Sequence, residues 1–423
     1  TAVPDALVYY RIKLLKEMGV NAYRCSHNPP SKSVLEACDK LGMMVLDEIR
    51  VIGTGAEYLG QFEKLILRDR NHASIMLWSL GNEETGVQNT DLGRRMAHTL
   101  VQRQRELDPS RLSTYGGNNG INFKGINQEM DVRGFNYHIK ELDDYHKEHP
   151  TQPIIFSEVS SMVSSRGMYA KDSIKGYLPD YDLNKPRWGQ TAEEWWKFTV
   201  ERPWLMGGFV WTGFDYLGEP TPYNSDETNL LNFRSDPSKK AELEKKLEEL
   251  KQSNPPSRSS YFGIIDLAGF KKDRFYSYQS HWKPEMPIAH IFPHWNWSER
   301  IGLVTPVHVY TSGDEGELFL NGKSLGRKKM TSGQDFRLVW DDVIYTPGTL
   351  KVICYKNGKE WATEEIKTTG TAEKLSLSVD RSVIAADGTD FAFITVSVSD
   401  KEGLTVPRSN QLIRFSIEGA GEI

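Results

Sequence analysis

The 423-residue sequence is long enough for two or three domains, and its 38% hydrophobic content, with 11 Trp and 17 Phe, can fill several cores. Its formal net charge is −5 and its charges are interspersed, which argues against the basic surface typical of nucleic-acid-binding proteins. No run approaches the roughly 18 apolar residues of a membrane-spanning helix, and the three cysteines lack the spacing of a disulfide framework or a zinc site.

The first 215 residues alternate helical patterns with short apolar runs. Gly19 follows the first helical pattern as a C-cap glycine would, Ser31 and Ser33 are candidate caps of the second, and GTGAEYLG (53–60) is predicted to be a loop. Helices are predicted at 6–18, 31–42, 91–107, 191–201 and 272–282. The apolar runs cover 21–27, 43–49, 74–84, 111–117, 132–138, 153–159 and 207–215. Runs that are apolar throughout indicate strands of a parallel sheet that is buried on both faces.

Each predicted strand changes from apolar to polar at its C-terminal end. The residues at these ends include Arg24, His27, Asp47, Glu48, Asn82, Glu83, Tyr137, His138, Glu158 and Asp215. In a (β/α)₈ TIM barrel the active site lies at this end of the strands, so a barrel is predicted. A doubly wound sheet is the alternative, although no glycine-rich phosphate loop opens the chain. About seven strands are recognisable and the sequence begins in a helix, so we expect the first barrel strand to precede Thr1 in a longer protein.

The rest of the sequence predicts further domains. Residues 235–253 have the charge pattern of a surface helix inserted into the barrel domain. After the barrel, short strands alternate with tight turns, and Asn-Gly pairs at 321–322 and 357–358 mark hairpins. The predicted domains are a catalytic barrel over 1–284, an immunoglobulin-like β-sandwich over 285–370 and part of a second one over 371–423. Without the expected first strand, we expect residues 1–423 alone to have little activity.

Two of the strand-end residues are glutamates that suit acid–base and nucleophilic chemistry. Glu83 follows the LWSLGN run and Glu158 ends the PIIFS run. A retaining glycosidase needs two carboxyl groups about 5–5.5 Å apart, one to protonate the leaving oxygen and one to attack the sugar. We therefore predict that Glu83 and Glu158 face each other across the barrel mouth at this separation. The alternative is that they are surface carboxylates.

Several stretches resemble the barrel of glycoside hydrolase family 2, which contains β-galactosidases, β-glucuronidases and β-mannosidases. They are NAYRCSHNPP (21–30), VLDE (45–48), RDRNHASIMLWSLGNE (68–83), IIFSE (154–158) and GGFVWTGFDYLGEPTPY (207–223). The resemblance runs from Arg11 to about Trp282, and the family carries β-sandwiches on both sides of its barrel. It implies an exo-acting retaining hydrolase that cleaves terminal β-glycosides by double displacement.

The same resemblance implies roles for particular residues. Glu83 would be the general acid/base and Glu158 the nucleophile. Asn82 would hydrogen-bond the sugar 2-hydroxyl, and Arg24 and Tyr137 would hold Glu158 in its charged form. The charge on Glu158 would in turn raise the pKa of Glu83 so that it can donate a proton.

Two aromatic residues complete the expected sugar site. His27 would line the sugar subsite, and Trp211 would form its floor, with a cis peptide bond between Trp211 and Thr212. A structural histidine and a core tryptophan are the alternative interpretations. Asp47, Glu48 and Asp215 are placed to hydrogen-bond residues around the site, and Glu84 is interpreted as a loop neighbour. No catalytic role is assigned to any of these four residues.

The sequence departs from the metal-dependent β-galactosidases of the family. Those enzymes have an acidic residue and a histidine two places apart shortly after the VLDE strand, and a histidine three places after the nucleophile. Here IRVIGTGAE (49–57) has no such pair, and Ser161 stands at the second position. We therefore predict no catalytic metal and no other cofactor.

The leading prediction for the substrate is a terminal β-D-galactoside, because RCSHNPP, GEPTPY and the trailing sandwiches look most like bacterial β-galactosidases. A β-glucuronidase, the alternative, would need a cationic Asn-x-Lys clamp after the last barrel strand, and none occurs between Trp211 and Gly269. Asn122-Phe123-Lys124 has this pattern after an earlier strand, where we interpret it as coincidental. A β-mannosidase is less favoured. A non-catalytic carbohydrate-binding module is a remote alternative, since both carboxylates are present.

The expected partner is an oligosaccharide or glycoconjugate substrate. Nucleic acid and a membrane span are not expected, and a homo-oligomer is compatible with the sequence. The expected location is the periplasm or the outside of the cell.

Overall fold

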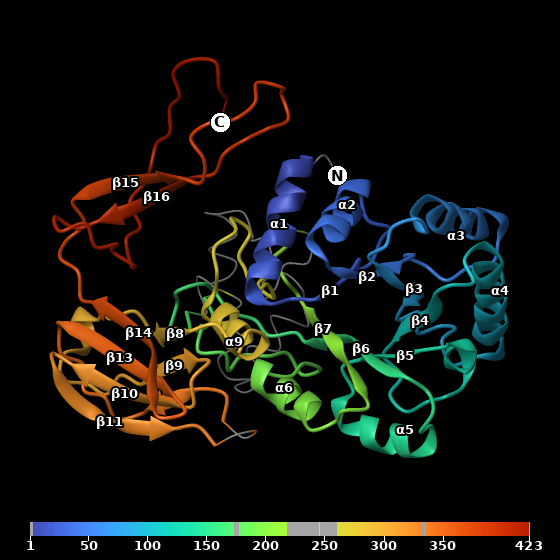
Figure 1. Ribbon diagram of the computed structural model, residues 1–423, viewed down its shortest axis with the longest axis horizontal. Coiled ribbons are helices and arrows are strands. Elements are labelled where there is room, and N and C mark those ends of the chain that lie inside the picture. Colours follow the sequence, from blue (N-terminus) through green and yellow to red (C-terminus); the bar gives the residue numbers. More distant parts are fainter. Residues whose placement is uncertain are drawn as a thin grey trace.

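A computed structural model describes residues 3–172, 177–217, 245, 260–331, 333 and 335–422 of the chain. A parallel sheet with helices around it forms the first part, and antiparallel sheets form the second part (Figure 1). The parallel strands are β1 (Ala22–Arg24), β2 (Met44–Glu48), β3 (Ile75–Asn82), β4 (Leu112–Gly117), β5 (Arg133–Asn136), β6 (Ile154–Ser160) and β7 (Leu205–Trp211). They pair in sequence order, from β1 to β7. The barrel-like parallel sheet predicted from the apolar runs is confirmed.

Helices precede or follow most of these strands and cover the outside of the sheet (Figure 1). They are α1 (Asp5–Met18), α2 (Lys32–Leu41), α3 (Ala56–Asp69), α4 (Asp91–Leu107), α5 (Leu142–Glu148), α6 (Ala192–Val200) and α9 (Asp273–Trp282), with short 3₁₀ helices η1 (Gly125–Glu129) and η2 (Ile139–Glu141). Gly19 ends α1 in the left-handed conformation at φ 105°, which glycine adopts without steric cost. The predicted helix at 235–253 lies outside the described residues, apart from residue 245.

Two local predictions were wrong. The expected loop at 53–60 ends at Gly55, because α3 begins at Ala56 and buries Phe62, Leu65 and Ile66 against the barrel. This apolar spacing lies beyond the stretch on which the loop prediction was based. Ser31 is the residue before α2, but its side chain makes no capping hydrogen bond, because its hydroxyl pairs with that of Ser33 at 2.9 Å.

The barrel core lies between the sheet and its helices, where Leu35, Val45, Trp78 and Phe156 are almost completely buried. Strands β1 and β7 are the two edges of the parallel sheet within the described part of the chain. A cavity of about 1420 Å³ lies between α1, β1 and β7. The expectation of a barrel strand before Thr1 stays a prediction.

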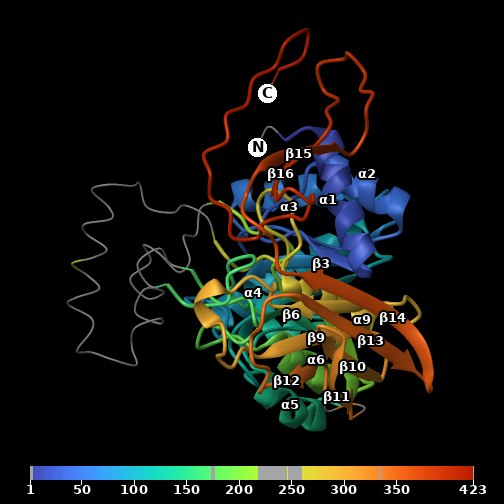
Figure 2. The ribbon, with the colours of Figure 1, turned by 90° about the vertical axis from the view of Figure 1, so that its left-hand side faces the viewer.

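The second part contains two sheets that pack face to face. One has the order β12 (Leu338–Trp340), β9 (Val307–Thr311), β8 (Ala289–Phe292), and the other has the order β11 (Lys323–Lys329), β10 (Glu315–Leu320), β13 (Thr349–Lys356), β14 (Lys359–Lys367). A 3₁₀ helix, η3 (Ser298–Arg300), lies between β8 and β9. Val309, Leu318, Trp340 and Val352 share the core of this β-sandwich, which faces the viewer in Figure 2. This packing explains the alternation of apolar and polar residues along its strands.

A separate hairpin of β15 (Lys374–Val379) and β16 (Ile394–Ser399) follows the β-sandwich (Figures 1 and 2). Phe393, next to β16, packs on Tyr10 of α1 with ring centroids 4.3 Å apart. None of the helices that the structure describes combines the length and apolar character needed to cross a bilayer.

Candidate active site

The predicted site residues meet at the C-terminal ends of the barrel strands. Arg24 ends β1, Asn82 ends β3 and Glu83 follows it, Tyr137 follows β5, Glu158 lies in β6, and Trp211 ends β7. A cavity of about 1100 Å³ opens at this end, and its lining includes His27, Asn82, Glu83, Tyr137, Glu158 and Trp211. Arg24 lies behind it and binds Glu158 directly. The structure therefore brings all seven residues together.

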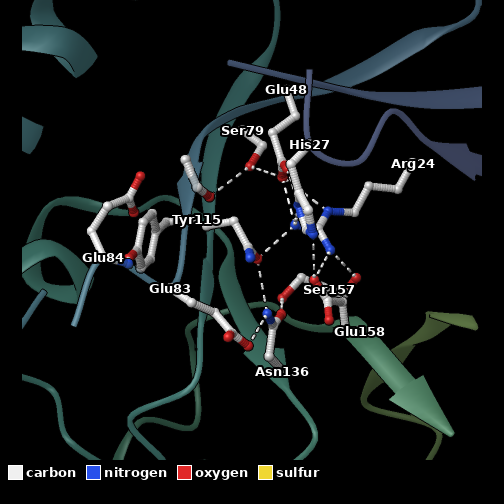
Figure 3. A network of polar contacts seen from close by, with 12 residues as sticks. Arg24, His27, Glu48, Ser79, Glu83, Glu84, Tyr115, Asn136, Ser157 and Glu158 are labelled. Carbon is white, nitrogen blue, oxygen red and sulfur yellow. Dashed lines mark hydrogen bonds and ion pairs between the residues drawn. The ribbon is translucent and has the colours of Figure 1, made fainter. Parts of the chain in front are cut away.

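The Glu158 carboxylate is held by a donor on each oxygen. The Tyr137 hydroxyl donates to Oε2 at 2.9 Å. Arg24 Nη1 donates to Oε1 at 2.8 Å (Figure 3). His27 Nε2 lies 3.5 Å from the same Oε1. Burial and the neighbouring Glu158 charge raise the pKa of Tyr137, so this phenol stays protonated and able to donate. The two hydrogen bonds expected for Glu158 are confirmed, and they fix the orientation of its carboxylate.

Arg24 connects several barrel strands through one guanidinium group. Its Nε and Nη2 donate to Glu48 Oε2 at 2.9 and 2.7 Å, and its Nη1 also donates to the Ser157 carbonyl at 2.9 Å. Burial would lower the pKa of Arg24, but the Glu48 and Glu158 carboxylates outweigh it and raise the pKa. The guanidinium is therefore permanently charged and pre-positioned beside Glu158.

Glu48 has a larger part in the site than the sequence suggested. It is completely buried, and it accepts hydrogen bonds from Arg24, from the Ser79 hydroxyl at 2.7 Å and from His27 Nδ1 at 2.9 Å. Burial would raise its pKa, but Arg24 and His27 lower it below the ordinary value. A charged Glu48 thus orients both a guanidinium and an imidazole that face Glu158. Its place at the end of β2 was predicted to suit hydrogen bonding around the site, but its individual partners were not predicted.

Glu83 has a different environment, with one amide donor. Asn136 Nδ2 donates to Glu83 Oε1 at 2.8 Å and also to Asn82 Oδ1 at 2.9 Å. Burial is the main cause that raises the pKa of Glu83, and the Glu158 charge is the second. The sequence-based expectation of a raised pKa is therefore confirmed in direction. Asn136 itself was not predicted, although it directly precedes Tyr137 at the end of β5.

Asn82 is oriented by its neighbours. Its Oδ1 accepts from both Arg24 Nη2, at 2.9 Å, and Asn136 Nδ2. No described residue accepts from its Nδ2, so this amide group is free to donate to a ligand in the cavity. The close packing requires Gly116, since a Cβ there would lie 2.5 Å from Asn82 Oδ1 and 2.9 Å from Arg24 Nη2.

The backbone at the strand ends has an uncommon conformation. Glu83 and Tyr137 have φ values of 56° and 66°, in the left-handed region that residues other than glycine rarely adopt. Such conformations concentrate at functional sites, where the surrounding structure holds them. Here each one occurs where a strand ends and a side chain must turn into the cavity.

Trp211 and His27 form one wall of the cavity. Their rings are stacked, with centroids 5.1 Å apart and planes 17° apart. The Trp211–Thr212 peptide bond is cis, as predicted. Trp211 is only partly buried and its ring lines the cavity, which favours the sugar-platform interpretation over that of a core residue.

Other residues considered from the sequence lie elsewhere. Asn122, Phe123 and Lys124 are absent from the cavity lining, and Phe123 packs on His149. Asp215 pairs with Lys272 at 2.9 Å. Ser161 does line the cavity, where its hydroxyl accepts from the Trp188 indole at 3.3 Å. Among the described residues, no three His, Cys, Asp or Glu side chains are grouped as a metal site requires.

Comparison with known proteins gives three matches along the chain. Residues 1–248 match the TIM barrel domain of glycosyl hydrolases family 2. Residues 302–362 match a domain of unknown function, and residues 375–423 match C-terminal domain 5 of glycoside hydrolase family 2.

Three similar proteins are named as β-glycosidases or as particular types of β-glycosidase. The β-galactosidase BoGH2A of Bacteroides ovatus is 34% identical over 100% of this chain and 53% of its own length. A putative β-glucuronidase of Formosa agariphila is 30% identical over 98% of this chain and 40% of its own length. The crystal structure of a β-glycosidase from Bacteroides vulgatus is 32% identical and superimposes with a TM-score of 0.77, covering 96% of this chain and 52% of that one. The chain thus spans about half the length of the Bacteroides ovatus and Bacteroides vulgatus proteins. With its barrel matched over residues 1–248, it belongs to glycoside hydrolase family 2.

Proposed function

We propose that the protein is a retaining, exo-acting β-galactosidase that works by double displacement. The observation that carries this proposal is the pairing of Glu83 and Glu158 in one cavity with opposite electrostatic surroundings. Glu158 faces a fixed cation and a phenol donor, whereas the pKa of Glu83 is raised. A carboxyl group with a raised pKa, beside a second carboxyl group that is held in place by hydrogen-bond donors, is an arrangement suited to one acid/base and one nucleophile. Their separation, expected at about 5–5.5 Å, stays a prediction.

In the first step, Glu158 attacks the anomeric carbon while Glu83 protonates the glycosidic oxygen, which leaves with the aglycone. This forms a glycosyl ester on Glu158. The Arg24 and Tyr137 hydrogen bonds hold the carboxylate in place for the attack. Fixing a nucleophile in this way lowers the barrier because no side-chain reorganisation is needed during the reaction.

In the second step, the ionised Glu83 takes a proton from water as its oxygen attacks the anomeric carbon, and the Glu158 carboxylate leaves as the sugar is released. The Glu158 charge is one of the causes that raise the pKa of Glu83, and that charge is absent while the ester exists. Ester formation therefore lowers the pKa of Glu83 at the point where it must act as a base. The Asn82 Nδ2 donates to the sugar 2-hydroxyl in both steps, a contact that strengthens in the transition state.

Two observations support galactose as the sugar. The Bacteroides ovatus relative is a β-galactosidase, and no Asn-x-Lys motif occurs in the sequence between Trp211 and Gly269. A β-glucuronidase is the second candidate, because the Lys140 and Arg187 side chains line the cavity and no described residue pairs with either one. Either cation can pair with a uronate carboxylate.

The test uses the full-length protein with nitrophenyl β-galactoside, β-glucuronide and β-mannoside in parallel. We expect the galactoside to have the highest kcat/KM, and NMR to detect β-galactose as the first sugar released. If α-galactose appears first, the enzyme inverts and the double displacement is wrong. Faster turnover of the glucuronide would favour the second candidate, and sugar binding without turnover would favour a carbohydrate-binding module.

A further inference from the structure

The site cavity is larger than one sugar ring requires. Its volume of about 1100 Å³ exceeds the roughly 300–1,000 Å³ of typical pockets for drug-sized ligands. The residues assigned to the galactosyl group, with Trp211 as its platform, occupy the strand ends. Much of the remaining lining comes from residues 138–141 and from the segment 185–190, which contributes Lys185, Arg187 and Trp188 among others. This segment has no part in the mechanism described above.

Trp188 is the second aromatic platform of the cavity. Trp188 is 40% exposed. The indole Nε1 donates to the Ser161 hydroxyl at 3.3 Å, and the next residues bind the end of β6, where Gln190 N donates to the Ser160 carbonyl at 2.7 Å. The ring is therefore anchored beside the strand that carries Glu158 and presents a face to the cavity.

The β-sandwich holds both ends of this segment. Arg337 Nη1 donates to the Tyr181 carbonyl at 2.7 Å, before the segment, and Arg337 Nε pairs with Glu193, after it. The Tyr310 hydroxyl donates to Asp182, and both residues are buried. Arg337 is itself only 9% exposed. Tyr310 and Arg337 lie in the part of the chain that matches a domain of unknown function.

We propose that residues 185–190 form the leaving-group subsite, that Trp188 stacks against a sugar ring of a glycan aglycone, and that Arg337 of the β-sandwich is a positioning residue for this segment. This rests on the proposed function. A pyranose ring presents polarised C–H groups on one face, which favour the negative face of an indole. The domain of unknown function would thus act on substrate selection without touching the substrate.

The test compares two substrates of the full-length protein, β-galactosyl fluoride, which has no sugar aglycone, and a β-galactosyl disaccharide. For Trp188→Ala we expect KM for the disaccharide to rise about 5- to 10-fold, with kcat/KM for the fluoride unchanged. Tyr9→Ala on α1, which removes an equally exposed ring outside the cavity, is the matched control. An equal loss on both substrates would place Trp188 in the galactosyl site, and no loss on either would remove it from substrate binding. Both results overturn the proposal.

Arg337→Ala should give the same split between the substrates, and Arg337→Lys should restore part of the disaccharide KM because it keeps the charge. Arg327→Ala is the control in the same domain, since Arg327 pairs with Glu315 at 2.6 Å and not with the segment. A disaccharide KM equal to that of the wild type in a folded Arg337→Ala variant contradicts the positioning role. If Arg337→Ala does not fold, a wild-type disaccharide KM in Arg337→Lys contradicts it instead. If the wild-type protein does not hydrolyse galactosyl fluoride, this result contradicts the proposed function alone. The comparison is then made with the glucuronyl pair.

Discussion

The surroundings of Glu158 and of Glu83 differ in both charge and number of donors. Glu158 receives a guanidinium on one oxygen and a phenol on the other, and His27 lies nearby. Glu83 receives one amide donor from Asn136, and burial raises its pKa. The difference teaches how one type of side chain can take the two proposed roles. Glu158 lies beside a cation, whereas burial and the Glu158 charge raise the pKa of Glu83.

The largest effect is expected from removing the Glu158 carboxylate. Glu158→Ala should lower kcat by more than about 10⁴-fold on every substrate, since no group remains to form the covalent bond. Added azide should then attack the sugar directly and give α-galactosyl azide, the product of a single inversion. Formation of β-galactosyl azide instead would mean that the two roles must be exchanged.

Removing the Glu83 carboxyl group should have a smaller effect that depends on the leaving group. Glu83→Ala should lower kcat/KM by about 10²–10⁴-fold on galactosides with a poor leaving group, because protonation of the leaving oxygen is lost. With dinitrophenyl galactoside the first step should be nearly unchanged, and burst kinetics should show accumulation of the ester. A uniform loss on both substrates would contradict the acid role.

The packing that connects the surroundings of Glu83 and Glu158 can be disturbed without changing either glutamate. Gly116→Ala places a methyl group where Asn82 and Arg24 now lie, so we expect kcat/KM to fall about 10²-fold, as a displacement of about 1 Å can cost. Gly60→Ala, whose added methyl group meets no atom within 4 Å, is the control and should leave kcat/KM unchanged. Wild-type kinetics for Gly116→Ala would show that the packing tolerates this shift.

The pH dependence gives the smallest and most specific effect. Glu83 must be protonated in the free enzyme, so kcat/KM should fall as pH rises through its pKa, which lies above the ordinary glutamate value. Asn136→Leu removes the hydrogen bond that lowers this pKa, so the alkaline limb of the profile should move to higher pH. A limb that stays in place would mean that Asn136 does not tune Glu83.

Much of this architecture could be predicted from the sequence, because strands buried on both faces are apolar throughout and end in polar residues. The positions of Arg24, Glu83, Tyr137 and Glu158 followed from that pattern and from the family resemblance. The role of Asn136 and the hydrogen-bond partners of Glu48 could not be predicted, since they depend on contacts between strands far apart in the sequence. The same is true of Trp188, whose segment is flanked by residues that Arg337 of the β-sandwich contacts. The start of α3 was missed because its apolar residues lie one turn beyond the glycines that suggested a loop.

The way Arg24 is bonded has a consequence for engineering. If Glu158 is replaced by glycine, the guanidinium loses one acceptor but keeps Glu48, the Ser157 carbonyl and Asn82. The barrel mouth should therefore keep its shape when the nucleophile is deleted. Such a variant should accept α-galactosyl fluoride in the space left by the carboxylate and transfer the sugar to an acceptor, with Glu83 as the base. The yield of new oligosaccharide from the variant would be compared with the yield of hydrolysis product from the wild type. A high yield would show that one substitution converts the proposed hydrolase into a synthetic catalyst.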